Sequence, residues 1–210
     1  MPNKDGREYR AMDMTVRADE GDKPSYRVDG YASTFAPYKL YTYDGVDYFE
    51  RIQPTAFKEA DLSDVVFRVE HEGRVYARTG NGSVEIYVDE HGLGHHSDLS
   101  RTPAARELFE DIKAGNYPKM SFAFRVAPGG DHYEPETHTR VIDKIEKVFD
   151  VSPVAFPANP NTELNVSARS YFDGVIKAAQ EAERLRALEL KRKRLKTHIK
   201  TKIGGKKDGF

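Results

Sequence analysis

The residues best suited to do chemistry in this sequence are polar side chains that interrupt or end apolar runs. Ser121 lies in the segment 120–124, where a loop is expected to become a strand. A serine held rigidly at such a point can face its oxygen toward a cleft, which is what a nucleophile requires. Taken alone, the motif favours a structural reading, a small residue at a strand start. Whether Ser121 is a nucleophile therefore depends on its partners.

A serine nucleophile needs a base within hydrogen-bonding reach. His71 follows the apolar run 65–69, so we expect it at the end of a buried strand, with Gly73 letting the chain turn away. The alternative is a purely structural histidine at a strand end. Among the seven histidines, His71 is the best placed to act as a base.

Three other histidines, His91, His95 and His96, cluster around an expected hairpin turn. Three imidazoles so close in sequence could bind zinc. No known zinc-ligand spacing accompanies them, however, and the adjacent pair should point to opposite strand faces. A surface hairpin is therefore favoured, and no metal is expected. The remaining histidines are expected to be solvated: His132, His138 and His198.

Asp150 interrupts the otherwise apolar strand-like segment 148–152. A carboxylate in such a strand is costly to bury unless it is paired, which makes Asp150 a candidate to orient the imidazole. Glu146 shares its parity along the strand, so both carboxylates are expected on the same face. Glu146 is therefore the alternate acid. The competing interpretation is that this face is simply exposed to water.

Composition bounds the kind of protein that could carry these residues. The chain has 210 residues, of which 32% are charged and 38% hydrophobic, which predicts a modest core with extended ends. With no cysteine, a disulfide, a thiol nucleophile and a cysteine-ligated metal are excluded. The sequence shows neither the apolar region of a secretory signal peptide nor a run of about 18 apolar residues, the length that a membrane span requires. We expect a soluble intracellular protein.

The elements that must position these side chains are mostly strands. Strands are expected at 28–35, 49–52, 65–69, 75–79, 84–88, 93–99, 121–126, 139–145 and 148–156, with one more around residues 9–16. A helix should begin at Thr102 and Pro103, run to about Lys113 and stop at Gly115. Residues 55–60 should form one or two helical turns. A loop or hairpin is expected over 38–48, and a polar excursion around 129–135.

The composition changes in the C-terminal part of the sequence, where residues 171–200 show a helical pattern rich in Ala, Leu, Glu, Lys and Arg. Leu185, Leu188 and Leu195 recur there at helical spacings. From Lys177 onward, twelve basic residues face four acidic ones, a net charge of +8, which leaves about −9 on the rest. A solvated amphipathic helix is one interpretation, and a docking segment is the other. Nucleic-acid binding suits the charge but not the lack of aromatic residues.

Eight segments of the sequence, in order, resemble the prohead (capsid maturation) proteases of tailed bacteriophages, serine peptidases related in fold to herpesvirus assemblin. They are residues 28–32 with Phe35, 50–57, the strand ending in His71, 77–79 with Gly82, 89–93, 108–115, 119–124 and 149–160. Each segment alone is weak, but eight in register identify the family. The resemblance implies an α+β, assemblin-like fold, a mostly antiparallel β-barrel flanked by helices, with a charged helix at the C-terminus.

The resemblance also implies the roles of the candidate residues. Ser121 matches the nucleophile, His71 the general base, and Asp150 the orienting acid, with Glu146 as the alternate. That third position lies where the family usually reads Glu-Val-Ser, and assemblin has a histidine, so a shorter aspartate must approach by one more methylene. Ala123 replaces the usual glycine after Met-Ser-Phe. The arginine-rich loop of assemblin has no counterpart, so backbone N–H groups are the default oxyanion donors.

The function implied by the resemblance is a serine endopeptidase that cleaves scaffold and capsid protein, and itself, inside the prohead in the host cytoplasm. The domains would be a flexible segment 1–24, a protease domain 25–168 and a basic helical tail 169–210. The major capsid protein and a scaffolding protein or scaffold domain are the expected substrates. A homodimer is expected, with no cofactor, metal, membrane or nucleic-acid partner. The alternatives are a non-catalytic scaffolding or capsid-associated protein with this fold and, less favoured, a metal-binding protein.

Overall fold

The computed structural model describes residues 6–12, 17–18, 25–155, 171–178, 181, 184–185 and 187–193 of the chain. By its internal contacts the chain divides into two units, Met1–Ala168 and Arg169–Phe210. Some sequence predictions lie outside the described residues, namely the domain end near Pro157, Leu195 and His198. The division by function into an N-terminal segment, a protease domain and a tail stays a prediction.

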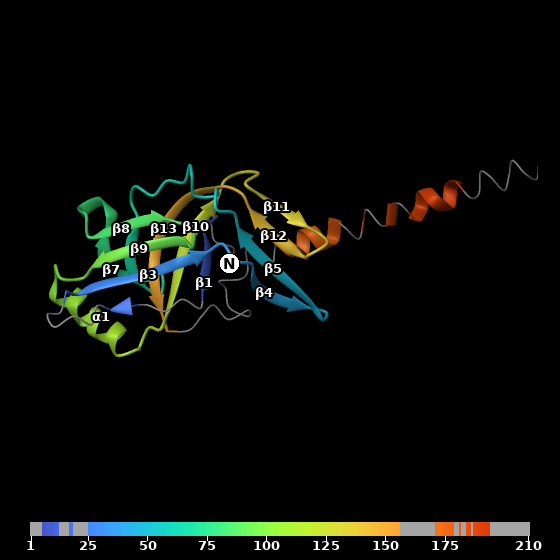
Figure 1. Cartoon of the computed structure of the whole chain (residues 1–210). Helices are drawn as coiled ribbons and strands as arrows, with labels where there is room; N and C mark the ends of the chain where they lie inside the picture. Colours follow the sequence, from blue (N-terminus) through green and yellow to red (C-terminus); the bar gives the residue numbers. More distant parts are fainter. Residues whose placement is uncertain are drawn as a thin grey trace, which may run out of the picture. The chain divides into compact units, whose positions relative to one another are not determined.

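The first unit is built mainly from strands, which confirms the predicted α+β class (Figure 1). The single α-helix of its described part is α1 (Pro103–Lys113), and η1 (Thr79–Asn81) is a short 3-10 helix. The strands are β1 (Glu8–Met12), β2 (Arg17–Ala18), β3 (Arg27–Thr34), β4 (Tyr38–Tyr43), β5 (Val46–Ile52), β6 (Val66–Val69), β7 (Glu72–Arg78), β8 (Val84–Val88), β9 (Gly92–Asp98), β10 (Lys119–Val126), β11 (Asp131–Glu134), β12 (Thr139–Ile142) and β13 (Ile145–Val154).

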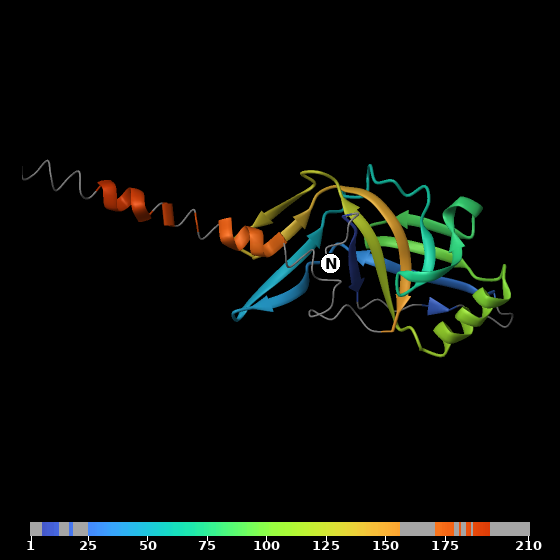
Figure 2. The same ribbon diagram turned by 180° about the vertical axis from the view of Figure 1, so that it is seen from behind.

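These strands form three sheets, in the orders β1-β10-β13-β6-β7, β11-β12-β5-β4 and β2-β3-β9-β8. Neighbours are antiparallel except for β12 with β5 and β13 with β6. The predicted closed barrel is wrong, because each sheet keeps two open edges among the described residues. Closure would require the edge strands to pair with one another. Instead the sheets meet by packing, as where β3 lies against β1 and β10. Figure 2 shows β10 and β13 side by side as long curved strands.

Helix α1 begins and ends where local signals predict. The Thr102 hydroxyl accepts a hydrogen bond from the Ala105 N–H, and Pro103 occupies the first turn. The chain leaves the helix through Gly115, which has a φ of +83° that suits glycine. The apolar face of the helix is buried, and Phe109 packs edge-on against Tyr26 at 5.4 Å between ring centres.

Local signals were less reliable in short segments. Residues 55–60 are not helical, because the bonds there run from Ala56, Lys58 and Ala60 to the carbonyl three residues before each. So short a segment cannot offset the cost of starting a helix.

Three further segments that were predicted only loosely contain strands. The polar excursion contains β11, which pairs with β12, and residues 38–48 form the β4–β5 hairpin. The strand predicted near Tyr9 is present as β1, paired with β10.

The core of the first unit explains where Ser121 faces. Met120, Phe122 and Phe124 alternate along β10 and are completely buried in the core. Because side chains alternate along a strand, Ser121 and Ala123 lie on the opposite face of the sheet.

The second unit has helical backbone at residues 171–178 and 187–193. About half of each of Leu185, Leu188 and Leu190 is exposed. None of the helices in the described parts of the chain is long and apolar enough to cross a membrane.

Candidate active site

Ser121 is the third residue of β10, so it lies within the strand rather than at its head. Its ladder partners are Ala11 on β1 and Ser152 on β13. A backbone paired on both sides is rigid, and the serine side chain is only 1% exposed. The hydroxyl therefore has the fixed position that the sequence predicted. Pairing on both sides of β10 fixes it, and not a loop-to-strand junction.

His71 lies in a tight turn, not at a strand end. Val69 and Glu72 pair across β6 and β7, which leaves Glu70 and His71 as a two-residue hairpin turn. Their φ angles are +50° and +61°, and positive φ at both central residues is what a type I′ turn requires. Neither residue is glycine, so each pays roughly 1–2 kcal/mol for this conformation. The turn directs the imidazole back over the sheet, where 7% of it remains exposed.

A continuous chain of hydrogen bonds joins three predicted site residues. His71 Nε2 lies 2.6 Å from Ser121 Oγ, and His71 Nδ1 lies 2.6 Å from Asp150 Oδ1. A carboxylate can only accept, so the Nδ1 proton points to Asp150 and Nε2 is left to accept from the serine hydroxyl. The Tyr9 ring packs edge-on against the imidazole, with 4.7 Å between ring centres.

Asp150 lies on the same sheet face as Ser121, because Ser121 pairs with Ser152 and Ala123 with Asp150 in unbroken register. A β-bulge follows directly after this stretch. Ala123 pairs with Asp150, but the next residue, Phe124, pairs with Val148, so Phe149 is an extra residue in β13. A bulge interrupts the alternation of faces along a strand. A second register shift leaves Glu146 unpaired as well, so the regular alternation on which the expected shared face of Glu146 and Asp150 depended does not hold between them.

The two carboxylates lie in different surroundings. Asp150 is 2% exposed, whereas Glu146 is exposed and lies 3.1 Å from the Arg125 Nε. The structure brings Ser121, His71 and Asp150 together and leaves Glu146 out of the hydrogen-bonded chain.

Sequence reasoning missed two further contributors. The fully buried Ser152 hydroxyl donates to Asp150 Oδ1 at 2.9 Å. Its spacing of two residues from Asp150 places both on one strand face, so strand parity was a usable signal. The Arg10 carbonyl lies 2.9 Å from Ser121 Oγ, but this backbone contact spans 111 residues and had no sequence signal. With a single proton, the Ser121 hydroxyl can donate to His71 or to Arg10, not to both at once.

A buried charge network fixes the strand that brings Arg10 to Ser121. Arg10 Nε lies 2.5 Å from Glu50 Oε1, and Arg140 Nη1 lies 2.6 Å from Glu8 Oε2. Burial alone would raise the pKa of Glu8, but the charges and hydrogen bonds of Arg10 and Arg140 lower it to about 2. Tyr38 also donates to Glu50. The network ties β1 to the sheet that contains β5 and β12.

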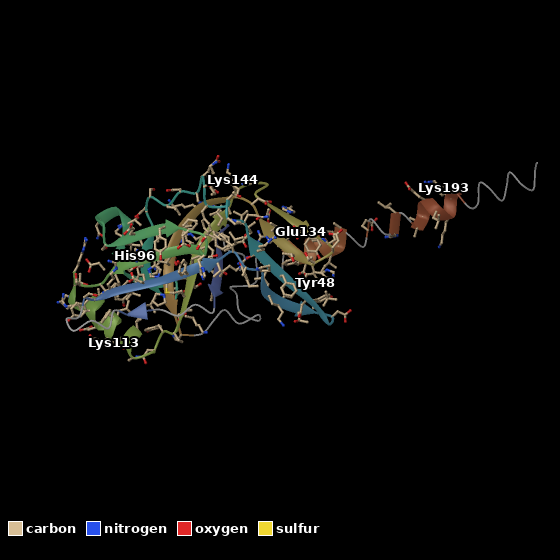
Figure 3. All side chains as sticks on the ribbon, in the orientation of Figure 1. Tyr48, His96, Lys113, Glu134, Lys144 and Lys193 are labelled. Carbon is tan, nitrogen blue, oxygen red and sulfur yellow. The ribbon has the colours of Figure 1, made fainter. Side chains whose placement is uncertain are left out.

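The histidines considered for zinc do not gather into one site. His95 is completely buried, with Nδ1 3.0 Å from Ser97 Oγ, so the surface-hairpin interpretation is wrong for this residue. His96 is on the same sheet (Figure 3), and its Nδ1 lies 2.6 Å from Asp29 Oδ1. His91 is exposed in the turn after β8. Within the described ranges, no three histidines or carboxylates are grouped so as to hold a metal.

The chain can now be compared with known proteins. No curated protein sequence and no solved structure that was compared gives a significant match. A sequence model of one family, described as caudovirus prohead serine protease, matches residues 12–174. That range includes Ser121, His71 and Asp150 and covers well over half of the chain. The chain therefore belongs to the caudovirus prohead serine protease family.

Proposed function

We propose that Ser121, His71 and Asp150 are the nucleophile, general base and orienting acid of this serine protease. The observation that carries the proposal is the unbroken chain of two 2.6 Å contacts from Ser121 Oγ through the imidazole to Asp150. Membership of a serine protease family supports the reaction class. Nucleophile, base and orienting acid in this order are the arrangement that activates a serine hydroxyl for acyl transfer.

In the proposed reaction, His71 Nε2 takes the hydroxyl proton as Ser121 Oγ attacks the scissile carbonyl carbon. The imidazolium then gives this proton to the leaving amine, and an acyl-enzyme remains. Water, deprotonated by the same nitrogen, attacks the acyl carbon, and the imidazolium returns this proton to Ser121 Oγ as the second product leaves. Asp150 holds the imidazole in the required tautomer and stabilises its positive form. Backbone N–H groups are the proposed donors to the oxyanion.

The supporting residues have distinct parts in this scheme. The Ser152 hydroxyl, by donating to Asp150 Oδ1, keeps that carboxylate oriented toward the imidazole. The Arg10 carbonyl offers the resting Ser121 hydroxyl a second acceptor. Attack requires the proton on the His71 side, so the balance between these two acceptors is part of how readily Ser121 is activated.

We further propose that the substrates are the major capsid protein and the scaffolding protein or scaffold domain, together with the chain itself. Cleavage would take place inside the assembling prohead, in the cytoplasm of the host. The family description, which names a prohead protease of tailed phages, supports this setting. A homodimer and a docking or self-removed tail stay predictions from the resemblance.

The test is covalent labelling with a fluorophosphonate probe, followed by mass spectrometry of the capsid protein co-expressed with each variant. The wild-type chain should be labelled and should shorten the capsid protein, and Ser121→Ala should do neither. Ser63→Ala, which removes an exposed hydroxyl bonded to Asp61, is the matched control and should behave as wild type. Cleavage retained by Ser121→Ala would refute the assignment. Absence of both labelling and cleavage in every chain, the wild type included, would favour the non-catalytic alternative.

A further inference from the structure

The turn that carries His71 closes the β6–β7 hairpin but lies beyond the ladder that joins β6 to β13. Strand β6 pairs with β13 at only two positions, Val66 with Asp150 and Phe67 with Val151. The turn residues Glu70 and His71 follow three residues later, both with positive φ. Such conformations persist only where the surrounding structure enforces them. Some contact other than the β6–β13 ladder must therefore hold the turn against β13.

Glu70 supplies that contact with both its backbone and its side chain. Its N–H donates to the Pro153 carbonyl at 3.2 Å. Its carboxylate oxygen Oε1 accepts from the Ala155 N–H at 2.7 Å. An ionised acceptor makes this second bond stronger than a neutral one. Together the two bonds fasten the turn to the far end of β13, the strand that also carries Asp150.

We propose that Glu70 is a positioning residue for the reaction, one that keeps both imidazole nitrogens of His71 aligned at once. The inference rests on the proposed function, in which His71 is the base. Both nitrogens have partners at 2.6 Å, so a small rotation of the turn would lengthen one or both contacts. A misplacement of about 1 Å can reduce a rate by about a hundredfold. Glu70 itself contacts none of the three reacting side chains through these bonds.

A second role for Glu70 would be electrostatic, because a negative charge next to His71 favours the imidazolium. The carboxylate is exposed, so water and salt screen its field. The short bond to Ala155 depends instead on an acceptor oxygen, which glutamine also has. Glu70→Gln therefore separates the two roles, since it removes the charge and keeps the acceptor.

The experiment follows fluorophosphonate labelling of the full chain over a range of probe concentrations and pH. Glu70→Ala should lower the maximal labelling rate about tenfold, with the half-saturating probe concentration and the midpoint of the pH–rate profile unchanged. Glu70→Gln should label within about twofold of wild type. Glu70→Gly relieves the positive φ but lacks the acceptor, so it should be as slow as Glu70→Ala. Glu72→Ala, which removes an exposed carboxylate on the other side of His71, is the control.

Three outcomes would overturn the inference. Wild-type labelling by Glu70→Ala would show that the anchor does not matter. Equal slowing of Glu70→Gln and Glu70→Ala, with a displaced pH midpoint, would show that the charge acts and not the anchor. Labelling retained by His71→Ala would overturn the proposed function and this inference with it. If His71→Ala abolishes labelling while Glu70→Ala does not, the triad stands and only the role of Glu70 falls.

Discussion

Acidification should destabilise this protein through His95, a residue with no part in the proposed chemistry. The imidazole is completely buried, and its Nε2 has no hydrogen-bond partner among the described residues. The Phe67 ring lies 5.6 Å away, centre to centre. Burial lowers the pKa of His95 to about 4, against a smaller raising effect of Asp29 and with a small lowering effect of His96. The folded protein thus holds His95 neutral where the unfolded chain would protonate it.

The size of the effect follows from the two pKa values, 6.5 in the unfolded chain and about 4 in the folded one. Between them the unfolded state binds more protons, so the free energy of unfolding falls by about 1.4 kcal/mol for each unit of decreasing pH. The stabilisation is fully present above the unfolded pKa and is lost as the pH falls to the folded pKa. The total loss should be about 3 kcal/mol, a large share of the stability of a typical domain.

The assay is urea denaturation followed by circular dichroism at several pH values between about 7 and 4. All proteins should carry Ser121→Ala, so that self-cleavage cannot distort the curves. Added to this background, His95→Gln should flatten the pH dependence by about 3 kcal/mol over that range. The carboxylates titrate equally in both chains and cancel in the comparison. If His95→Gln does not fold, His95→Leu serves instead. The same loss of stability with and without His95 would refute the reasoning.

Three further predictions concern the site and its support. Asp150→Asn should slow fluorophosphonate labelling about 10³–10⁴-fold by favouring the wrong imidazole tautomer, whereas Glu146→Gln should label as wild type; the reverse result would make Glu146 the acid. Glu50→Gln should lower the free energy of unfolding by about 3–5 kcal/mol in urea titrations, because it removes the buried carboxylate that pairs with both Arg10 and Arg140. Thr102→Ala should cost about 1 kcal/mol in the same titration by removing the cap of α1, and an unchanged midpoint would contradict that role.

Elements with local signals were predicted well from the sequence. Thr102, Pro103 and Gly115 mark the ends of α1 through capping, a fixed φ and a positive φ, all of which depend on neighbouring residues only. The β8–β9 hairpin was predicted from its alternating pattern and the intervening turn. Short segments such as 55–60 failed, because six residues contain too few signals to separate a helix from successive turns.

Predictions of how elements combine were less successful. The closed barrel was wrong because local patterns do not reveal which edge strands pair. The parity argument for Glu146 and Asp150 did not hold, because the register with β10, and not the β13 sequence, places shifts at Phe149 and at Glu146. The burial of His95 was missed because it depends on packing against another sheet, the five-stranded one, whose Phe67 ring contacts the imidazole.

For the candidate site, the sequence alone identified Ser121, His71 and Asp150 as polar residues placed among apolar strand residues, where burial is costly without partners. It also placed them in one protease family through segments in register. The tertiary structure decided which atoms meet. His71 lies 50 residues from Ser121 and 79 from Asp150, and their contacts depend on the pairing of β10 with β13 and on a strained turn bonded through Glu70. Such contacts are long-range consequences of folding, so no local pattern could have determined them.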